Sequence, residues 1–266
     1  MSFYIADQRN NRIVKWQLNS FFGQVVAHGN GNENGIHQLY SPSDVLLDKN
    51  NLSLIVCERE RHRLTRVFLQ EPIKPPEVIL KTACNYLTRD HNGDIYISDL
   101  GGASVKRWQE EQSRLKIIAG GNERGDALNQ LDYPQGIFVD NNSSVYVADT
   151  NNHRVVKWAR DAKEGIVVAG GQGVGNGAMQ LNGPSGLVLD HFDNIYVVDE
   201  GNRRVMRFPK GSQSGTVVIS QFTDKHGVNS LYFPQDILFD RQGNLYIVDS
   251  FNFRVLKFEV ECYSDC

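Results

Sequence analysis

The sequence lacks any long apolar run. No stretch approaches the roughly 18 consecutive apolar residues that would span a bilayer. No signal peptide is visible either, because the first eleven residues, MSFYIADQRNN, already read as repeat sequence. We therefore expect a soluble chain that does not insert into a membrane. The sequence leaves the choice between an extracellular and a cytoplasmic location open.

The sequence also lacks an excess of basic residues. It has 28 Lys and Arg against 31 Asp and Glu, for a net charge of −3 and a pI of about 6.2. Domains that bind nucleic acids usually carry a basic stripe, and none is visible here. Charges of both signs alternate along the chain, which is typical of a solvated surface. The charge pattern therefore argues against a nucleic-acid partner.

Only four cysteines occur, and none lies in a CxxC motif or in zinc-finger spacing. A structural zinc site is therefore not expected. We predict that Cys57 is a free buried thiol, because the same repeat position holds small residues elsewhere and free cysteine is commonly buried. Cys262 and Cys266 lie in a short tail, where they could pair if the protein is extracellular. The fourth cysteine, Cys84, takes the place of a repeated proline.

A repeat of about 50 residues organises the chain. The stretch PQGIFVDNNSSVYVADTNNHRVVKW returns as PSGLVLDHFDNIYVVDEGNRRVMRF and as PQDILFDRQGNLYIVDSFNFRVLKF. A fixed period of roughly 40 to 50 residues is typical of propellers and solenoids. The acidic residue that ends the second apolar run is separated by 51, 41, 50, 50 and 50 residues between copies, at positions Asp7, Glu58, Asp99, Asp149, Asp199 and Asp249.

Each complete copy contains four short strand candidates and no helical periodicity. In the fourth copy they cover residues 137–140, 145–149, 154–158 and 166–169, separated by turns rich in Asn, Asp and Gly. Four strands per repeat of this length predict one propeller blade per copy. The first and last copies supply only three strands each, so we expect 22 strands in six blades.

These patterns predict an all-β chain, a six-bladed β-propeller of four-stranded blades with incomplete blades where the N- and C-terminal ends meet. We expect a single domain over residues 1–266. Its units cover about 1–32, 33–80, 81–121, 122–171, 172–220 and 221–260, followed by a short cysteine-containing tail at 261–266.

The copies VADTNNHRVVKW, ADQRNNRIVKW and VDEGNRRVMRF resemble the NHL repeat, and the similarity covers nearly the whole chain. The resemblance implies an NHL-type six-bladed propeller. Members of that group serve as the substrate-binding or RNA-binding half of TRIM-type ubiquitin ligases, as extracellular sensor domains and as repeat modules. A related branch, the peptidyl-hydroxyglycine lyases, is enzymatic and metal-dependent.

Most recurring polar residues are expected to be structural, because a catalytic residue is needed once whereas a fold-building residue is needed in every blade. The repeated acid should cap its turn, and the Arg five residues later should pair with a nearby carboxylate or carbonyl; Ser104 replaces that Arg in the third copy. A second acid recurs at the end of the first strand. Its members could form a calcium-binding ring or serve hairpin turns, and we favour the turns, at Asp48, Asp90, Asp140, Asp190 and Asp240.

No catalytic set, cofactor motif or metal site is predicted. The segment 170–175, GGQGVG, lacks the Lys-Ser/Thr pair of a P-loop and no helix follows it. None of the seven histidines falls on a predicted inner strand, and no Ser/His/Asp set can be named from spacing.

Residues that differ between copies on one face of the fixed scaffold are the candidate binding residues. The loops that lead into the inner strands and the turns between strands two and three should share that face. At the channel mouth these residues are Asp44, Asn85, Tyr86, Gln135, Ser185, Gln235 and Asp236, and in the turns they are Arg9, Arg59, Arg61, Arg203, Phe251 and Phe253.

We therefore predict a non-catalytic scaffold that binds a protein or peptide on this face. The nearest alternative is the substrate-recognition module of a TRIM-NHL-type E3 ubiquitin ligase, or an RNA-binding NHL domain. The alternative from another class is a metal-dependent lyase or hydrolase resembling peptidyl-hydroxyglycine lyase.

Overall fold

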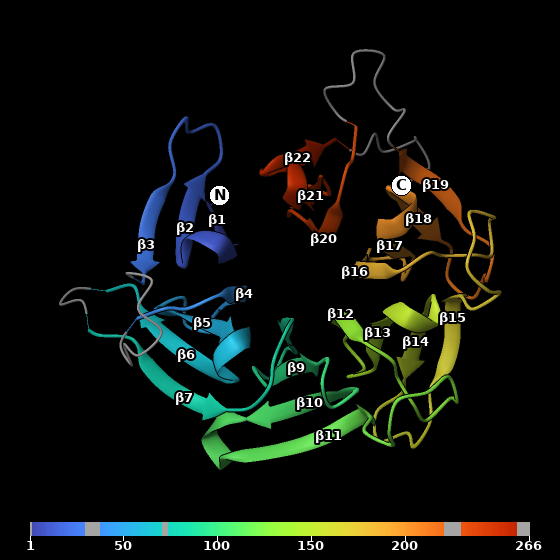
Figure 1. The fold of residues 1–266 in the computed structure, drawn as a ribbon, viewed down its shortest axis with the longest axis horizontal. Coiled ribbons are helices and arrows are strands. Elements are labelled where there is room, and N and C mark those ends of the chain that lie inside the picture. The colour runs from blue at the N-terminus through green and yellow to red at the C-terminus, as the bar shows by residue number, and fades with distance from the viewer. Residues whose placement is uncertain (1, 30–37, 71–73, 221–229, 260–266) are drawn as a thin grey trace. The chain divides into compact units, whose positions relative to one another are not determined.

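The computed structural model describes residues 2–29, 38–70, 74–220 and 230–259. Within these ranges the chain forms 22 β-strands and six single-turn 3₁₀ helices, and it contains no α-helix. The strands make six antiparallel sheets of three or four strands, each built from consecutive strands (Figure 1). The fold is an all-β six-bladed propeller, and the predicted count of 22 strands is confirmed. No helix in the described ranges is long and apolar enough to cross a membrane.

The chain divides into two compact units, residues 1–117 and 118–266. The first unit holds three blades, and the last strand of the third blade extends three residues beyond residue 117, where the unit ends. These blades are β1 (Ser2–Asp7), β2 (Arg12–Gln17) and β3 (Gln24–His28); β4 (Pro42–Leu47), β5 (Ser53–Glu58), β6 (Arg63–Phe68) and β7 (Glu77–Lys81); and β8 (Leu87–Arg89), β9 (Ile95–Asp99), β10 (Ser104–Gln109) and β11 (Arg114–Gly120).

The second unit holds the other three blades. They are β12 (Pro134–Val139), β13 (Val145–Asp149), β14 (Arg154–Trp158) and β15 (Ile166–Gly170); β16 (Pro184–Leu189), β17 (Ile195–Asp199), β18 (Arg204–Phe208) and β19 (Thr216–Ser220); and β20 (Pro234–Phe239), β21 (Leu245–Asp249) and β22 (Arg254–Phe258). Among the described residues, the first and the sixth blade have three strands each, as the sequence predicted.

The repeated acid and Arg face each other at the end of the hairpin between the second and third strands. In the fifth blade Asp199 pairs with Arg204 in the strand register, and a 3₁₀ turn connects them. Arg203 closes that turn in the left-handed conformation, with φ of 53°. The 3₁₀ turns that follow the repeated acids have no side-chain cap hydrogen bond, so the predicted capping by the acid is not borne out there. In the fifth blade Asp199 Oδ1 instead accepts a hydrogen bond from Asn182 N, which anchors the hairpin to the loop before the blade.

Ion pairs confirm the predicted pairing of the repeated Arg with a carboxylate. Arg154 Nε lies 2.7 Å from Asp149 Oδ2, and Arg204 Nε lies 2.7 Å from Asp199 Oδ2. In the third blade, where Ser104 replaces the arginine, a different cation pairs with the repeated acid. There Lys106, two residues beyond Ser104, places its Nζ 2.6 Å from Asp99 Oδ2. A residue two positions further along a strand lies on the same face, so the cation reaches the same carboxylate.

The second repeated acid serves the hairpin turns. Asp140 Oδ1 accepts hydrogen bonds from the backbone N–H groups of Asn142, at 2.9 Å, and Ser144, at 2.8 Å. The equivalent acids make the same kind of bond in the other complete turns, at Asp48, Asp90, Asp190 and Asp240. These contacts agree with the turn interpretation of the pattern.

Apolar residues between neighbouring sheets form the core of each unit. In the second unit, Ala148 of β13 packs in one cluster with Leu181 and Leu187, which belong to the next blade and the loop before it. The repeated large rings close the same layers, and Trp158 and Phe208 are almost completely buried. Burial of side chains this large contributes roughly 1.5–3 kcal/mol each.

Cys57 is fully buried, as predicted, but the prediction that it is a free thiol is wrong. Cys57 forms a disulfide with Cys84, with an S–S distance of 2.06 Å and Cα atoms 5.9 Å apart. Cys57 occupies the repeat position that Ala148 holds in the fourth blade, and that position faces the start of the next blade. Cys84 stands at the start of the third blade, so the bond links the second blade to the third within the first unit. Cys262 and Cys266 lie outside the described residues.

Candidate binding surfaces

Three predicted binding residues of the first unit lie where β4 approaches the segment that leads into β8. Asp44 Oδ1 accepts a hydrogen bond from Val45 N, and its Oδ2 accepts one from Leu87 N, each at 2.7 Å. The backbone N–H of Tyr86 donates to Ser98 Oγ at 3.0 Å. Asn85 is buried, with 6% of its surface exposed. Asp44 therefore joins two blades, and Asn85 and Tyr86 are built into the same junction.

The turn arginines of the first unit lie in the 3₁₀ helices η1 (Gln8–Asn10) and η2 (Arg59–Arg61). Arg9 is exposed and helps to line a shallow pocket of about 380 Å³, together with Tyr40 and Glu60. The Arg61 guanidinium lies 5.2 Å from the centre of the Tyr40 ring. Of the predicted turn arginines in this unit, Arg9 lines the pocket, whereas Arg61 contacts it through Tyr40 and Arg59 does not line it.

In the second unit, the predicted residues Gln135, Ser185 and Gln235 each follow the proline that begins an inner strand. Ser185 is fully buried. Gln235 accepts a hydrogen bond from Ser250 Oγ. The next position, Gly136, must remain glycine, because a Cβ there would lie 2.3 Å from the backbone oxygen of Ser185. These inner strands therefore approach each other too closely for a side chain at that position.

Two carboxyl groups near these strands have raised pKa values. Burial raises the pKa of Glu200 from its ordinary 4.5 to about 7, and a hydrogen bond with Ser185 partly opposes this rise. Burial also raises the pKa of Asp236 from 3.8 to about 6, against the opposing hydrogen bond from Ile237 N. Asp236 is among the binding residues predicted from the sequence, whereas Glu200 is not. The available signal was that the residue after the repeated acid is acidic only in the fifth copy.

Replacing Glu200 with glutamine should flatten the dependence of stability on pH. Because its pKa is raised on folding, Glu200 binds more protons in the folded state, so stability falls as the pH rises from about 4.5 through 7. We expect Glu200→Gln to unfold at about the same urea concentration as the wild type at pH 4.5. At pH 8 it should be about 1–2 kcal/mol more stable, after allowance for partial exposure.

Urea unfolding at both pH values measures this effect, with the exposed Glu164→Gln as the matched control. Wild-type and Glu200→Gln curves that stay parallel from pH 4.5 to 8 would contradict the assignment of a buried, largely protonated carboxyl.

Aromatic side chains gather on the sixth blade, in an arrangement that we call the aromatic surface (Tyr232, Phe233, Phe251 and Phe253). The ring centres of Phe233 and Phe251 lie 4.6 Å apart, and those of Tyr232 and Phe251 lie 6.1 Å apart. Arg203, from the turn of the fifth blade, places its guanidinium 4.5 Å from the centre of the Tyr232 ring. The surface therefore combines several rings with one cation.

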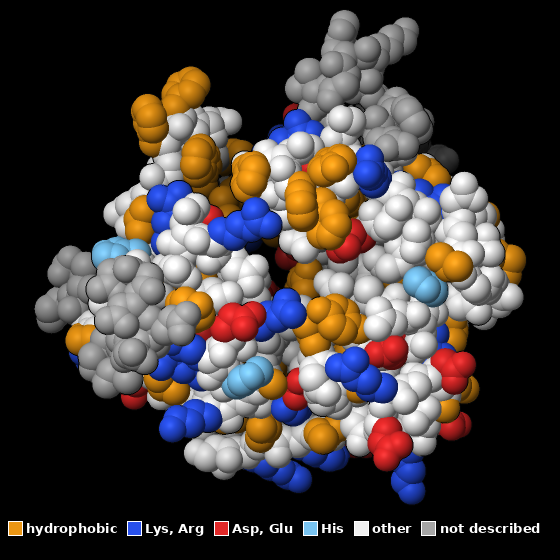
Figure 2. All heavy atoms as spheres, viewed as in Figure 1, with side chains coloured by type: hydrophobic (Ala, Val, Ile, Leu, Met, Phe, Trp, Pro, Cys, Tyr) orange, Lys and Arg blue, Asp and Glu red, His pale blue; other side chains and the backbone are white. Residues whose placement is uncertain are grey.

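The aromatic surface is open to solvent. Phe253 exposes 81% of its surface, Phe251 exposes 49% and Tyr232 exposes 48%. Figure 2 shows hydrophobic side chains gathered over β20–β22. The predicted residues Arg203 and Phe251 thus both contact Tyr232, and the predicted Phe253 ends the turn that carries Phe251. Tyr232 and Phe233 were not among the residues predicted from the sequence.

The described residues contain no group of three or more His, Cys, Asp or Glu side chains placed to hold a metal ion.

Comparisons with known proteins agree with this architecture. The family model of the NHL repeat matches residues 131–158, which cover the end of the loop before β12 and the strands β12 to β14. This match places an NHL repeat at residues 131–158 of the six-bladed β-propeller. A search of curated proteins found no match to the sequence.

Several solved structures share the fold at low sequence identity. An auxiliary nutrient binding protein from Bacteroides thetaiotaomicron is 14% identical to this chain, with a TM-score of 0.73. The alignment covers 96% of this chain and 65% of the Bacteroides chain. A chain from a nidogen/laminin complex is 16% identical, with a TM-score of 0.69. The alignment covers 97% of this chain and 89% of the other. Virginiamycin B lyase from Staphylococcus aureus is 11% identical, with a TM-score of 0.62. The alignment covers 98% of this chain and 81% of the lyase chain. The chain spans just under two thirds of the length of the Bacteroides protein.

Proposed function

We propose that this propeller is a non-catalytic binding module that recognises a protein or peptide through the aromatic surface of the sixth blade. The observation that carries the proposal is the exposure of Phe251 and Phe253 beside Tyr232 and Arg203. Large exposed apolar side chains in one place mark interaction sites, and aromatic and arginine side chains supply most hot spots in protein interfaces.

The chemistry of the surface favours a peptide segment with an apolar anchor. Phe251 packs against Phe233, which holds its ring in place, while Phe253 extends into solvent. A rigid ring loses little conformational entropy on binding, so it offers contact area at low cost. The similar fold in a nidogen/laminin complex supports a role in protein binding, and the similar nutrient binding protein supports a binding role in general.

The proposal can be tested with peptides selected from a random phage-displayed library on the immobilised protein. We expect selected peptides to bind Phe251→Ser/Phe253→Ser at least 30-fold more weakly, since loss of a hot spot costs about 2 kcal/mol or more. The matched control is Phe21→Ser/Phe22→Ser, which removes two rings that are 88% and 84% exposed in the loop between β2 and β3. Equal affinity for wild type and Phe251→Ser/Phe253→Ser would refute the proposed surface.

The wider set of face residues stays a prediction. Asp44 and Asn85 hold blade junctions, and Ser185 is fully buried, so their contribution to binding would be to shape the backbone that a partner meets. The recognition module of a ubiquitin ligase, the RNA-binding domain and the metal-dependent lyase likewise remain predictions from the family resemblance.

A further inference from the structure

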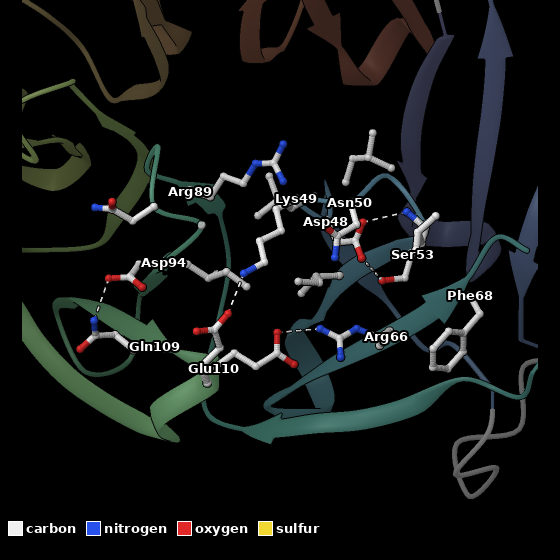
Figure 3. A pocket seen from close by; sticks show the side chains of 18 of the residues that line it. Asp48, Lys49, Asn50, Ser53, Arg66, Phe68, Arg89, Asp94, Gln109 and Glu110 are labelled. Carbon is white, nitrogen blue, oxygen red and sulfur yellow. Dashed lines mark hydrogen bonds and ion pairs between the residues drawn. The ribbon is translucent and has the colours of Figure 1, made fainter.

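A second pocket lies in the first unit, at the end of the strands opposite to η1 and η2. Its volume is about 610 Å³, and it lies between the second blade and the third. The turn between β4 and β5 forms one wall, and the turn between β8 and β9 together with the 3₁₀ helix η3 (Glu110–Gln112) forms the other (Figure 3). This size is typical of small-molecule sites, which measure about 300–1,000 Å³.

The carboxylates that line this pocket already have donors. Glu110 Oε2 lies 2.7 Å from Arg66 NH2, in an ion pair that crosses from the third blade to the second. The other carboxylates have the following donors: Ser53 Oγ for Asp48, Gln109 Nε2 for Asp94 and Lys49 Nζ for Glu111. Because each of these carboxylates already has a donor, the pocket is not expected to bind an added cation.

Two guanidinium groups of the pocket, by contrast, each have a nitrogen that lacks a hydrogen-bond partner. Arg89 NH1 and Arg66 Nε are both buried and have no hydrogen-bond partner. Among the described residues no hydrogen bond or ion pair reaches any nitrogen of the Arg89 side chain, which extends away from Asp94 in Figure 3. A buried donor without a partner costs roughly 1–3 kcal/mol, so the site favours an added acceptor.

The rest of the lining is suited to a hydroxylated molecule. Amide side chains line the cavity at Asn50, Gln70, Asn92 and Gln112, and each supplies both donors and acceptors. Phe68 adds an aromatic face, over which the Lys74 ammonium lies 5.5 Å from the ring centre. Guanidinium groups bind carboxylates and phosphates through paired, charge-assisted hydrogen bonds, which are stronger than the single bonds that the hydroxyl oxygens of a neutral ligand accept.

We propose that this pocket binds a hydroxylated anion of about the size of a sugar acid or sugar phosphate, with its oxyanion on Arg89. The site is separate from the aromatic surface and does not depend on the proposed protein-binding function. Because the unpartnered nitrogen is buried, binding requires the Arg89 guanidinium to turn toward the ligand.

Calorimetric titration of the full chain with D-glucuronate, glucose 6-phosphate and D-glucose tests the proposal. We expect at least one of the two anions to bind at least tenfold more tightly than D-glucose, and the preferred anion identifies the oxyanion. Arg89→Gln should weaken binding of that anion at least tenfold. Arg160→Gln, which removes an arginine whose side chain is 66% exposed in the second unit, should leave binding unchanged.

The thermal unfolding midpoint of Arg89→Gln should be no lower than that of the wild type, because the substitution removes a buried donor that has no hydrogen-bond partner. If this variant does not fold, Lys49→Gln, at an exposed position of the same pocket, should weaken anion binding instead. No binding of either anion at millimolar concentration would overturn the proposal. It would equally be overturned if D-glucose bound as tightly as the anions, or if the anion affinity of folded Arg89→Gln were unchanged.

Discussion

Replacing Asp199 with alanine is expected to lower the free energy of unfolding by about 3–5 kcal/mol, since this leaves a buried cation without its counter-charge. Asp199 is fully buried, and its Oδ2 accepts hydrogen bonds from Arg204 Nε at 2.7 Å and Asn202 Nδ2 at 2.8 Å. Its Oδ1 accepts a bond from Asn182 N at 2.6 Å. The carboxylate thus holds the hairpin of the fifth blade and the loop that precedes the same blade.

Urea unfolding measures this loss, and the chain contains a matched control. The first blade has the same pair, but the Arg12 and Asp7 side chains are 41% and 26% exposed. Asp7→Ala should therefore cost only about 1 kcal/mol or less. In Asp199→Ala/Arg204→Met, removal of the unpaired cation should recover part of the loss. Equal destabilisation by Asp7→Ala and Asp199→Ala would show that burial does not determine the strength of the pair.

Removing the disulfide by Cys57→Ser/Cys84→Ser is expected to lower the free energy of unfolding by about 3.5 kcal/mol. The two cysteines are 27 residues apart, and closing a loop of that length restricts the unfolded chain by about this amount at 25 °C. Both sulfur atoms lie between neighbouring blades with little exposure, so the serine hydroxyls would also be buried in an apolar environment. The predicted value is therefore a lower bound for the substituted chain.

The bond itself can be checked by alkylation and mass spectrometry. A Cys262→Ser/Cys266→Ser background leaves only Cys57 and Cys84. The unreduced, urea-unfolded chain should take up no iodoacetamide, and the reduced chain should take up two equivalents. In the same background, reductant should lower the urea midpoint of folded protein. Two alkylated cysteines without reductant would show that the disulfide is absent.

The repeated positions made the fold predictable. Because the acid, the Arg five residues later and the large rings recur at a near-constant spacing, the sequence alone indicated six blades and their 22 strands. The pairing of Arg154 with a carboxylate followed from the same repetition, since a residue needed in every blade builds the blade. The exposed Phe251 and Phe253 were found as departures from a polar turn.

Contacts between different blades could not be predicted in this way. Cys57 and Cys84 lie in different copies, and a repeat pattern describes what a position does within its own copy. The burial of Glu200 and the unpartnered guanidinium of Arg89 likewise depend on the exact surroundings of one blade. The pairing of Lys106 with Asp99, in place of the arginine that Ser104 replaces, was also not predicted. It depends on which side chains of the strand lie on the same face as Asp99.

By itself, therefore, the sequence determined the class of fold, the number of strands and the structural role of each recurring residue, because local hydrophobic and turn patterns repeat with the blade. Only the tertiary structure decided which cysteines pair, which carboxyl group is buried and where unsatisfied donors surround a cavity. The disulfide and the pocket arise where side chains from neighbouring blades meet, and the burial of Glu200 depends on the side chains around one turn, which a repeat pattern does not describe.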